Sequence, residues 1–294
     1  MTPIVSIVTP SYNMAPFLRQ AVESVLDQDY PSIEYIVMDG GSTDGSVEIL
    51  KEYSGRLRFV SAPDQGQADA VNRGFLMAQG LTAKDSIFAF LNADDYYYPG
   101  AVRAVVDAFR GETVAGAVYG EAYHVSGDGV VLGRYPTQAY DPRGFESQCY
   151  ICQPACFLRG EVFREAGMLN PALHFGVDYD LWIRIAKRHP MRKIDTYLAC
   201  SRLHPGAKTM ARTKQVYREI FQVLKTHYGY VPMQWIYGYA ALLLDGKVRA
   251  RGVAPPTAAN AALSLLLGSI ENPRHLFRFW ADFWRKGVEW QAGR

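Results

Sequence analysis

Two adjacent carboxylates, Asp94 and Asp95, follow the apolar run 87–91 and close the segment Asn92–Asp95. Carboxylates at the end of a buried strand are costly unless water solvates them or a cation pairs with them. Hard divalent cations such as Mg²⁺ and Mn²⁺ take oxygen ligands and also bind substrate phosphates. The pair therefore predicts a metal site that holds a nucleotide diphosphate. The alternative is a strand-end turn that caps the next helix.

Glycine and small polar residues fill a second segment, Asp39–Gly45, between a predicted strand and a predicted helix. Glycine allows a ligand to approach the backbone closely, and a helix start offers free N–H groups. Asp39, fixed at the strand end, could accept hydrogen bonds from a base or a ribose. The other interpretation is an ordinary tight turn in which Ser42 or Thr43 caps the helix.

A second acidic pair, Asp178 and Asp180, begins the predicted helix 178–188. Acidic residues at a helix start are often caps, because the helix dipole favours them there. Capping accounts for one of the two aspartates, Asp178 or Asp180, but need not account for both. The other carboxylate could be the general base for an acceptor hydroxyl.

Arg202 and His204 form a polar cluster at the end of the predicted strand 194–203. His204 could ligate the metal or contact the phosphates. A lone histidine is more often structural, so this assignment depends on the other polar segments.

The first two segments belong to a regular alternation of strands and helices over the first ~120 residues. The predicted strands are 4–8, 33–38, 57–60 and 87–91, and the predicted helices are 16–28, 42–53, 68–78 and 99–109. Such alternation predicts an α/β fold with a mainly parallel, Rossmann-like sheet flanked by helices. Ligands of these sheets bind beyond the carboxyl ends of the strands. We therefore expect one rim to carry the polar segments that follow the four strands, which are Thr9–Asn13, Asp39–Asp44, Asp64–Gln67 and Asn92–Asp95.

The pattern changes after residue 115. Residues 118–125 and 130–134 predict a hairpin, 153–158 a further strand, and the chain from 213 onward a set of helices. We therefore expect a nucleotide-sugar domain over residues 1–212 and a C-terminal helical region over residues 213–294.

Residues 274–290 predict a strongly amphipathic helix. One side carries Leu276, Phe277, Phe279, Trp280, Phe283, Trp284, Val288 and Trp290, and the other carries Arg274, Arg278, Asp282, Arg285 and Glu289. Aromatic residues beside basic ones suit a helix on an anionic membrane surface. Docking onto the main domain or onto a partner in a homo-oligomer explains the same stripe.

Composition narrows the class of protein. The chain is 49% apolar and 20% charged, with a net charge of +2, so no overall field argues for a nucleic-acid partner. No apolar run reaches the ~18 residues that span a bilayer, and no signal peptide is evident at the N-terminus. We expect a cytoplasmic protein that is soluble or peripheral at the inner face of the membrane.

Six motifs in consistent order resemble family 2 of the inverting glycosyltransferases, which have the GT-A fold. They are Ser6–Asn13, Met38–Ser46, Ala70–Gly74, Asn92–Asp95, Asp178–Arg184 and Arg202–Gly206, and the match covers roughly residues 3–210. The resemblance implies a sugar transferred from a nucleotide-diphosphate sugar to an acceptor hydroxyl, with a divalent cation, Mn²⁺ or Mg²⁺, as cofactor. It also implies a role in assembling a cell-surface polysaccharide or glycolipid, on a saccharide or lipid-linked acceptor.

The resemblance assigns roles to individual residues. Thr9, Pro10 and Tyr12 would line the base pocket with Asp39 near base or ribose, and Asn72 and Arg73 would lie near the nucleotide and its phosphates. Asp94 and Asp95 match the acidic metal motif, in which one carboxylate binds metal and the other reaches the ribose side. His204 matches a position that helps to hold the diphosphate or metal, and Asp178 matches the general base.

Two positions depart from the family pattern. Gly40 replaces a second acidic residue, which leaves the base open: UDP is favoured, with dTDP and GDP as alternatives. Val177 replaces a glutamate that many members carry before the catalytic aspartate, which leaves Asp180 as a rival to Asp178.

Two other functions fit parts of the pattern. A nucleotidyltransferase that makes an activated sugar should carry a Gly-rich, basic phosphate loop after the first strand, but Thr9–Asn13 has no Gly, Lys or Arg. A non-catalytic sugar-nucleotide-binding protein would not need the carboxylates of Asp94, Asp95 and Asp178.

Overall fold

The computed structural model describes residues 2–292 apart from 82, 84, 112–113 and 247–256, with side chains up to residue 285. The chain forms two compact units. The first comprises the residues up to 142 together with 150–207, and the second comprises 143–149 together with 208–294. The domain boundaries expected from the sequence, 1–212 and 213–294, stay a prediction.

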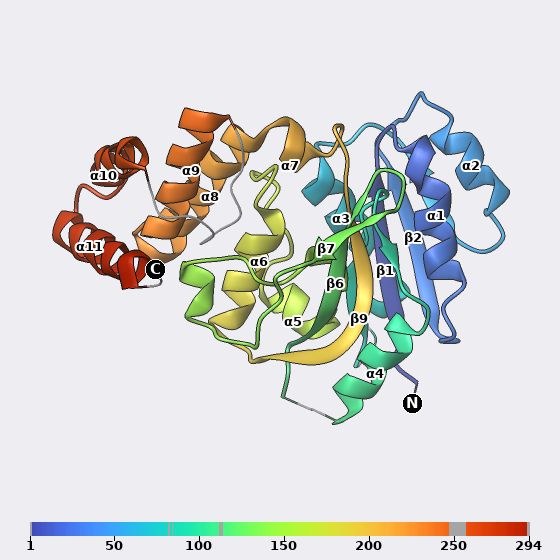
Figure 1. The fold of residues 1–294 in the computed structure, drawn as a ribbon. Helices are drawn as coiled ribbons and strands as arrows, with labels where there is room; N and C mark the ends of the chain where they lie inside the picture. Colours follow the sequence, from blue (N-terminus) through green and yellow to red (C-terminus); the bar gives the residue numbers. More distant parts are fainter. Residues whose placement is uncertain (1, 82, 84, 112–113, 247–256, 293–294) are drawn as a thin grey trace. The chain divides into compact units, whose positions relative to one another are not determined.

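The described part of the first unit is built on one nine-stranded sheet with the order β3-β2-β1-β4-β8-β6-β9-β5, in which β7 pairs with β6 (Figure 1). The strands are β1 Val5–Ser11, β2 Ile33–Asp39, β3 Arg58–Ser61, β4 Ile87–Phe90, β5 Tyr96–Tyr97, β6 Ala117–Ser126, β7 Val131–Arg134, β8 Cys156–Arg159 and β9 Met191–Leu203. Strands β3, β2, β1 and β4 are parallel, whereas β8 runs antiparallel to β4 and β6. The predicted α/β class is confirmed, and the predicted hairpin is β6–β7.

Helices cover both faces of this sheet (Figure 1). They are α1 Ala15–Leu26, α2 Ser46–Glu52, α3 Gln67–Leu76, α4 Ala101–Gly111, α5 Gly160–Glu165 and α6 Val177–Ala186. Helix α1 begins with a proline in its first turn and buries Leu18, Val22 and Val25 at helical spacing. These side chains join α2 and α4 in one core, whereas Phe75 of α3 stacks on Phe88 of β4 at 4.7 Å on the other face.

Parallel pairing places the polar segments together. Ser11 at the end of β1 pairs with Asp39 at the end of β2, Asp39 pairs with Ser61 of β3, and Val8 pairs with Phe90 of β4. The four carboxyl ends therefore share one rim of the sheet, as the sequence predicted. Strand β1 extends three residues beyond its predicted end because β2 pairs with it as far as Ser11.

The second unit contains the helices α7 Lys208–Ala211, α8 Thr213–Tyr228, α9 Met233–Asp245, α10 Ala258–Glu271 and α11 Leu276–Ala292. The rings of Tyr217 and Tyr239 join α8 to α9 at 5.5 Å. The buried side chain of Asn272, just after α10, accepts from the amide of Val231 at 2.7 Å and donates to its carbonyl at 3.0 Å. That reciprocal pair fixes the α8–α9 turn against α10, because both backbone groups of Val231 would otherwise be buried without partners.

Across the described residues, no helix is both long enough and apolar enough to cross a membrane.

The remaining short elements are the 3₁₀ turns Gln79–Leu81, Gly144–Glu146 and Gln153–Ala155. The last of these replaces the start of the predicted strand 153–158, where Pro154 removes a backbone donor from the ladder.

Candidate active site

The two carboxylates of the Asn92–Asp95 turn have different surroundings. Asp95 is 4% exposed, and its Oδ1 accepts the backbone N–H of Arg202 at 2.8 Å. Burial, followed by the neighbouring charge of Asp94, raises the pKa of Asp95 above its ordinary value. Asp95 therefore fastens the turn to the end of β9.

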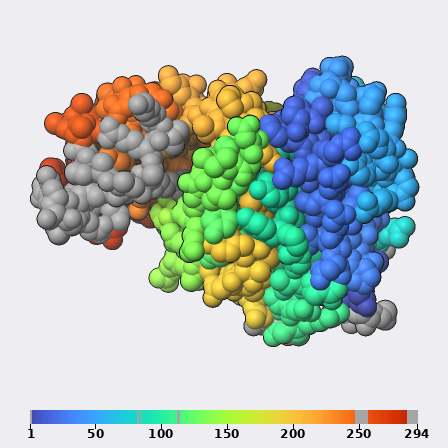
Figure 2. Space-filling view, turned by 45° about the vertical axis from the view of Figure 1, so that its right-hand side comes forward, coloured from blue at the N-terminus to red at the C-terminus, as the bar shows by residue number. Residues whose placement is uncertain are grey.

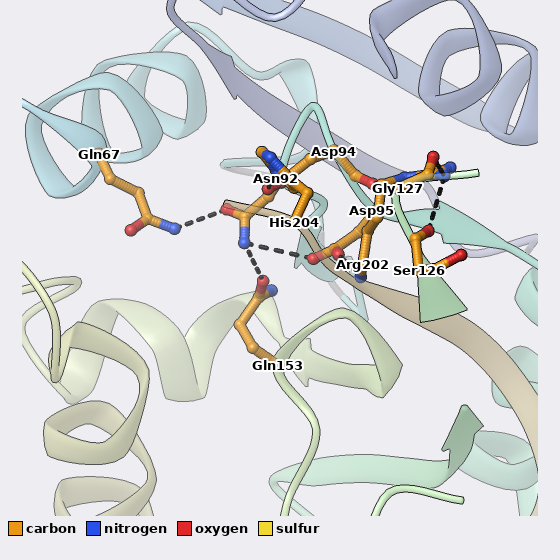
Figure 3. Close-up of polar contacts among 9 residues, drawn as sticks. All are labelled: Gln67, Asn92, Asp94, Asp95, Ser126, Gly127, Gln153, Arg202 and His204. Carbon is orange, nitrogen blue, oxygen red and sulfur yellow. Dashed lines mark hydrogen bonds and ion pairs between the residues drawn. The ribbon is translucent and has the colours of Figure 1, made fainter. Parts of the chain in front are cut away.

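Asp94 faces His204, and the two side chains come from segments that are 110 positions apart (Figure 3). Oδ2 of Asp94 lies 3.1 Å from Nε2 of His204. The imidazole ring packs against the ring of Phe17 of α1 at a centroid distance of 4.6 Å. A carboxylate oxygen and an imidazole nitrogen thus converge at a point beyond the end of β4.

Arg202 is the structural centre of this group, with 5% exposure. Its guanidinium donates to the carbonyls of Asp94 at 2.8 Å and of Gly127 at 2.7 Å, and to the side chain of Gln20. It also lies over the ring of Phe17, 4.9 Å from the centroid. One buried side chain therefore joins the acidic turn, the β6–β7 turn and α1, whose segments lie together on the surface in Figure 2.

A chain of amides holds Asn92, the first residue of the turn (Figure 3). Gln67 at the start of α3 donates to Oδ1 of Asn92 at 2.6 Å, and Asn92 donates to Gln153 at 3.2 Å. Gln153 in turn donates to the carbonyl of Phe90 at 2.6 Å. Gln153 cannot be identified from the sequence, because a lone glutamine 61 positions from Asn92 carries no signal of spacing or charge.

Asp39 is 2% exposed and serves the loop that follows it. Its Oδ2 accepts from the amides of Gly41 at 3.1 Å and Ser42 at 2.9 Å, and from the hydroxyl of Ser61 at 2.7 Å. The carboxylate thereby fixes the β2–α2 loop on the rim. Its predicted contact with base or ribose stays a prediction.

The three residues predicted to line the base pocket differ in how deeply their side chains are buried. Thr9 is fully buried, and its hydroxyl bonds the hydroxyl of Tyr35 at 2.9 Å, so its side chain faces the core. Pro10 is half-buried, and Tyr12 is 61% exposed. A Cβ on Gly40 would lie 3.3 Å from the ring of Tyr12 and 2.9 Å from Oδ2 of Asp64. Glycine at position 40 thus leaves room between Tyr12 and Asp64.

Asn72 and Arg73 on α3 were predicted to lie near the nucleotide and its phosphates. The amide of Asn72 donates to the carbonyl of Leu169 at 2.8 Å and accepts from its N–H at 3.0 Å. Arg73 forms a 3.7 Å ion pair with Asp69. Asn72 therefore holds the loop that leads into α6, and the nucleotide contacts of both residues stay predictions.

The acidic pair at the start of α6 divides in a similar way. Asp180 is 5% exposed and pairs with Arg184 at 2.8 Å, and Arg184 also donates to the carbonyl of Met168 at 2.7 Å. Asp178 is partly buried, and burial raises its pKa to about 6, partly offset by the amides of Asp178 and Tyr179. Asp180 thus has a structural ion pair, while Asp178 has the pKa of a base at neutral pH.

The structure therefore brings Asp94, Asp95 and His204 into one bonded group and places Asp39 on the same rim. Asp178 lies outside that bonded group, at the start of α6. Within the part of the chain that is described, His, Cys, Asp and Glu nowhere form a cluster of three or more suited to a metal.

Comparison with known proteins gives a family match. Residues 6–167 match the model of "Glycosyl transferase family 2". An uncharacterized glycosyltransferase of Rickettsia felis is 30% identical over 217 residues, covering 69% of this chain and 34% of that protein. Chondroitin synthase of Escherichia coli is 25% identical over 220 residues, covering 74% of this chain and 31% of that protein. The chain thus spans about one third of the length of these curated relatives.

Two solved structures share the fold. Staphylococcus aureus TarS 1–349 in complex with UDP-GlcNAc has a TM-score of 0.61 and 16% identity, and the match covers 82% of this chain and 71% of that one. The mannosyltransferase PcManGT of Pyrobaculum calidifontis, in complex with GDP-Man and Mn²⁺, has a TM-score of 0.57 and 17% identity, covering 98% and 88%. The predicted GT-A fold is confirmed.

Proposed function

Because this chain belongs to glycosyl transferase family 2, we propose that it transfers a sugar from a nucleotide-diphosphate sugar to an acceptor hydroxyl, with inversion at the anomeric carbon. The observation that carries this proposal is the convergence of Asp94 and His204 on the rim where the ends of β1, β2 and β4 meet. Ligands of parallel α/β sheets bind at that rim. The alternatives, a nucleotidyltransferase or a non-catalytic binding protein, receive no support from the relatives.

The donor set fits a divalent cation. Oδ2 of Asp94 and Nε2 of His204 approach within 3.1 Å and come from segments fastened by Arg202 and Asp95. One carboxylate and one imidazole suit Mn²⁺, with substrate phosphates and water as the remaining ligands. A bound cation would offset the charge that grows on the leaving diphosphate. Asp95, predicted as a third ligand, we instead assign to positioning the turn.

We assign the general base to Asp178. Its pKa of about 6 leaves it ionised at neutral pH and still able to accept a proton. In the proposed step, Asp178 takes the proton of the acceptor hydroxyl as that oxygen attacks the anomeric carbon, and the bond to the nucleotide diphosphate breaks. Asp180 is an unsuitable rival because its carboxylate pairs with Arg184.

The donor and acceptor follow from the relatives only by analogy. TarS is described with UDP and UDP-GlcNAc and PcManGT with GDP-Man, so we favour a UDP-sugar and keep GDP as the second candidate. Tyr12, Pro10 and the loop fixed by Asp39 would receive the base. Chondroitin synthase among the relatives supports a growing saccharide as acceptor and polysaccharide assembly as the process. We propose that this polysaccharide assembly takes place in the cytoplasm, at the inner face of the membrane.

The test is a thermal-shift screen of UDP, GDP and dTDP and their sugars, each with and without Mn²⁺. A ligand that binds only the native state raises the melting temperature. We expect one nucleotide to raise it in a manner that depends on Mn²⁺, and that donor to release nucleoside diphosphate on turnover. Release of pyrophosphate from a nucleoside triphosphate and a sugar phosphate would instead identify a nucleotidyltransferase.

A further inference from the structure

The aromatic stripe predicted for residues 274–290 contains both buried and exposed side chains in the structure. Phe279 is fully buried and Phe283 is 8% exposed, so both pack inside the second unit. Phe277, Trp280 and Trp284 are 86%, 43% and 67% exposed. The side chains of Val288, Glu289 and Trp290 lie outside the described residues. Packing within the unit thus accounts for only part of the stripe.

The exposed part continues onto the neighbouring helix α10. Leu266 and Ile270 are 59% and 62% exposed, and their i,i+4 spacing places them on one side of α10 with Ser269. The indole N–H of Trp280 donates to the hydroxyl of Ser269 at 3.1 Å. The α10–α11 face, defined by Leu266, Ile270, Phe277, Trp280 and Trp284, is therefore one surface.

The two helices that carry this face pack closely against each other. A Cβ on Gly268 of α10 would lie 1.8 Å from Cζ of Phe279, so the absence of a side chain there lets the two helices meet. Helix α10 begins with a capped turn, in which the hydroxyl of Thr257 accepts the amide of Asn260 at 3.2 Å. The exposed apolar residues are thus held outward by the packing beneath them.

The helical region that carries this apolar face is strongly basic. Residues 208–294 contain 13 Lys and Arg and five Asp and Glu, a net charge of +8, whereas the whole chain has +2. Arg274 lies exposed in the α10–α11 turn, between Ile270 and Phe277. Arg278 and Arg285 each follow an exposed aromatic residue by one position along α11, where Arg278 pairs with Glu146 and Arg285 pairs with Asp282 at 2.8 Å.

We propose that the α10–α11 face binds an anionic lipid surface, with Phe277, Trp280, Trp284, Leu266 and Ile270 in the boundary between headgroups and acyl chains. Exposed aromatic and aliphatic side chains beside arginine are the features of an interfacial helix. A second copy of this chain would cover the same apolar area. It would also bring together two helical regions that each carry a net charge of +8, and their mutual repulsion opposes such a dimer. The inference deepens the proposed function by fixing the surface through which the enzyme would reach a lipid-linked acceptor.

Flotation of the full chain with vesicles, without donor or metal, tests this surface. The vesicles are phosphatidylcholine alone or with 40% phosphatidylglycerol, at about 50 and 500 mM salt. We expect binding to the anionic vesicles that falls at high salt, because screening weakens the attraction of basic residues to the surface. The variant Phe277→Ser/Trp284→Ser should bind about tenfold less, because its lost apolar area no longer inserts.

Two further variants make the result specific. Leu266→Ser/Ile270→Ser changes the other helix and should lower binding similarly, which keeps the test informative if the aromatic variant fails to fold. Leu76→Ser/Leu132→Ser, at residues of the first unit that are 60% and 58% exposed, should bind like the wild type. The proposal is overturned if both α10–α11 variants bind the vesicles as well as the wild type does. It is also overturned if the wild type does not bind vesicles but forms a dimer that the two α10–α11 variants, and not the first-unit variant, disrupt. Nucleoside diphosphate release in detergent-free buffer tests the transferase activity separately.

Discussion

The Oδ2 atom of Asp94 lies 3.1 Å from Nε2 of His204, and the backbone carbonyl of Asp94 accepts a hydrogen bond from Arg202, two residues before that histidine. The end of β9 therefore holds the acidic turn at three points: through the buried guanidinium of Arg202, through its backbone N–H, which donates to Asp95, and through the imidazole. This arrangement gives the proposed cation site a fixed geometry before any donor binds. Pre-organised ligands are what a site needs to stabilise charge that develops during the reaction.

Replacing either member of this pair should abolish the response to metal. For His204→Ala and Asp94→Asn, we expect the Mn²⁺-dependent part of the nucleotide-induced thermal shift to vanish and turnover to fall by about two orders of magnitude or more, because stabilisation of the leaving diphosphate is lost. Chelation with EDTA should reproduce the loss in the wild type. His227→Ala, on α8 of the second unit, is the matched control. A retained Mn²⁺ response in both variants would exclude the pair as ligands.

Asp178→Asn should separate binding from chemistry. The substitution keeps size and hydrogen-bonding shape but removes the base, so we expect turnover to fall by about 10²–10⁴-fold with nucleotide affinity unchanged. Steady-state kinetics with calorimetric titration of the nucleotide measures both. Asp107→Asn, on α4 with a side chain 60% exposed, is a control in the first unit. Turnover by Asp178→Asn at the wild-type rate would transfer the role of base to another residue.

The rate should depend on pH through Asp178. Because burial raises the pKa of Asp178 to about 6, the base is protonated below that value and ionised above it. We therefore expect kcat/KM to rise with pH and to level off above about pH 7, with an apparent pKa near 6. A profile that is flat between pH 5 and 7.5 in the wild type contradicts this assignment.

The same shift makes a prediction about stability. A raised native pKa means that the folded state favours the protonated carboxyl, so the stabilising contribution of Asp178 is complete below about pH 3.8 and is lost as pH rises through about 6. Asp178→Asn stays neutral at every pH. We expect this variant to melt above the wild type at pH 8, with the gain diminishing towards pH 4. A gain of the same size at both values would have a cause other than titration.

Arg202→Met should weaken the fold of the first unit. The substitution removes the guanidinium that donates to the carbonyls of Asp94 and Gly127, and each buried acceptor left unsatisfied costs about 1–3 kcal/mol. We expect the free energy of unfolding to fall by about 2–4 kcal/mol in urea titration, with a weaker Mn²⁺ response in the protein that remains folded. Arg110→Met, at a guanidinium 55% exposed, should change stability by less than about 0.5 kcal/mol.

The sequence determined the local structure and which end of the sheet carries the polar segments. Apolar runs of strand length between helical patterns predicted β1, β2 and β4 within a few residues, and pairing of parallel strands then forces their carboxyl ends together. It also predicted Asp94, His204 and Asp178 as candidate chemical groups. Each of these inferences depends on neighbours in the chain or on the regular geometry of a sheet.

Only the tertiary structure decided which side chains are free to act. Asp95 and Asp180 look like Asp94 and Asp178 in the sequence, but a backbone amide 107 positions away engages the first and Arg184 engages the second. Thr9 is turned into the core by Tyr35, and Phe279 is buried while Phe277 is not. Periodicity cannot show such differences, because burial and hydrogen bonding at a given residue depend on what distant segments bring to it.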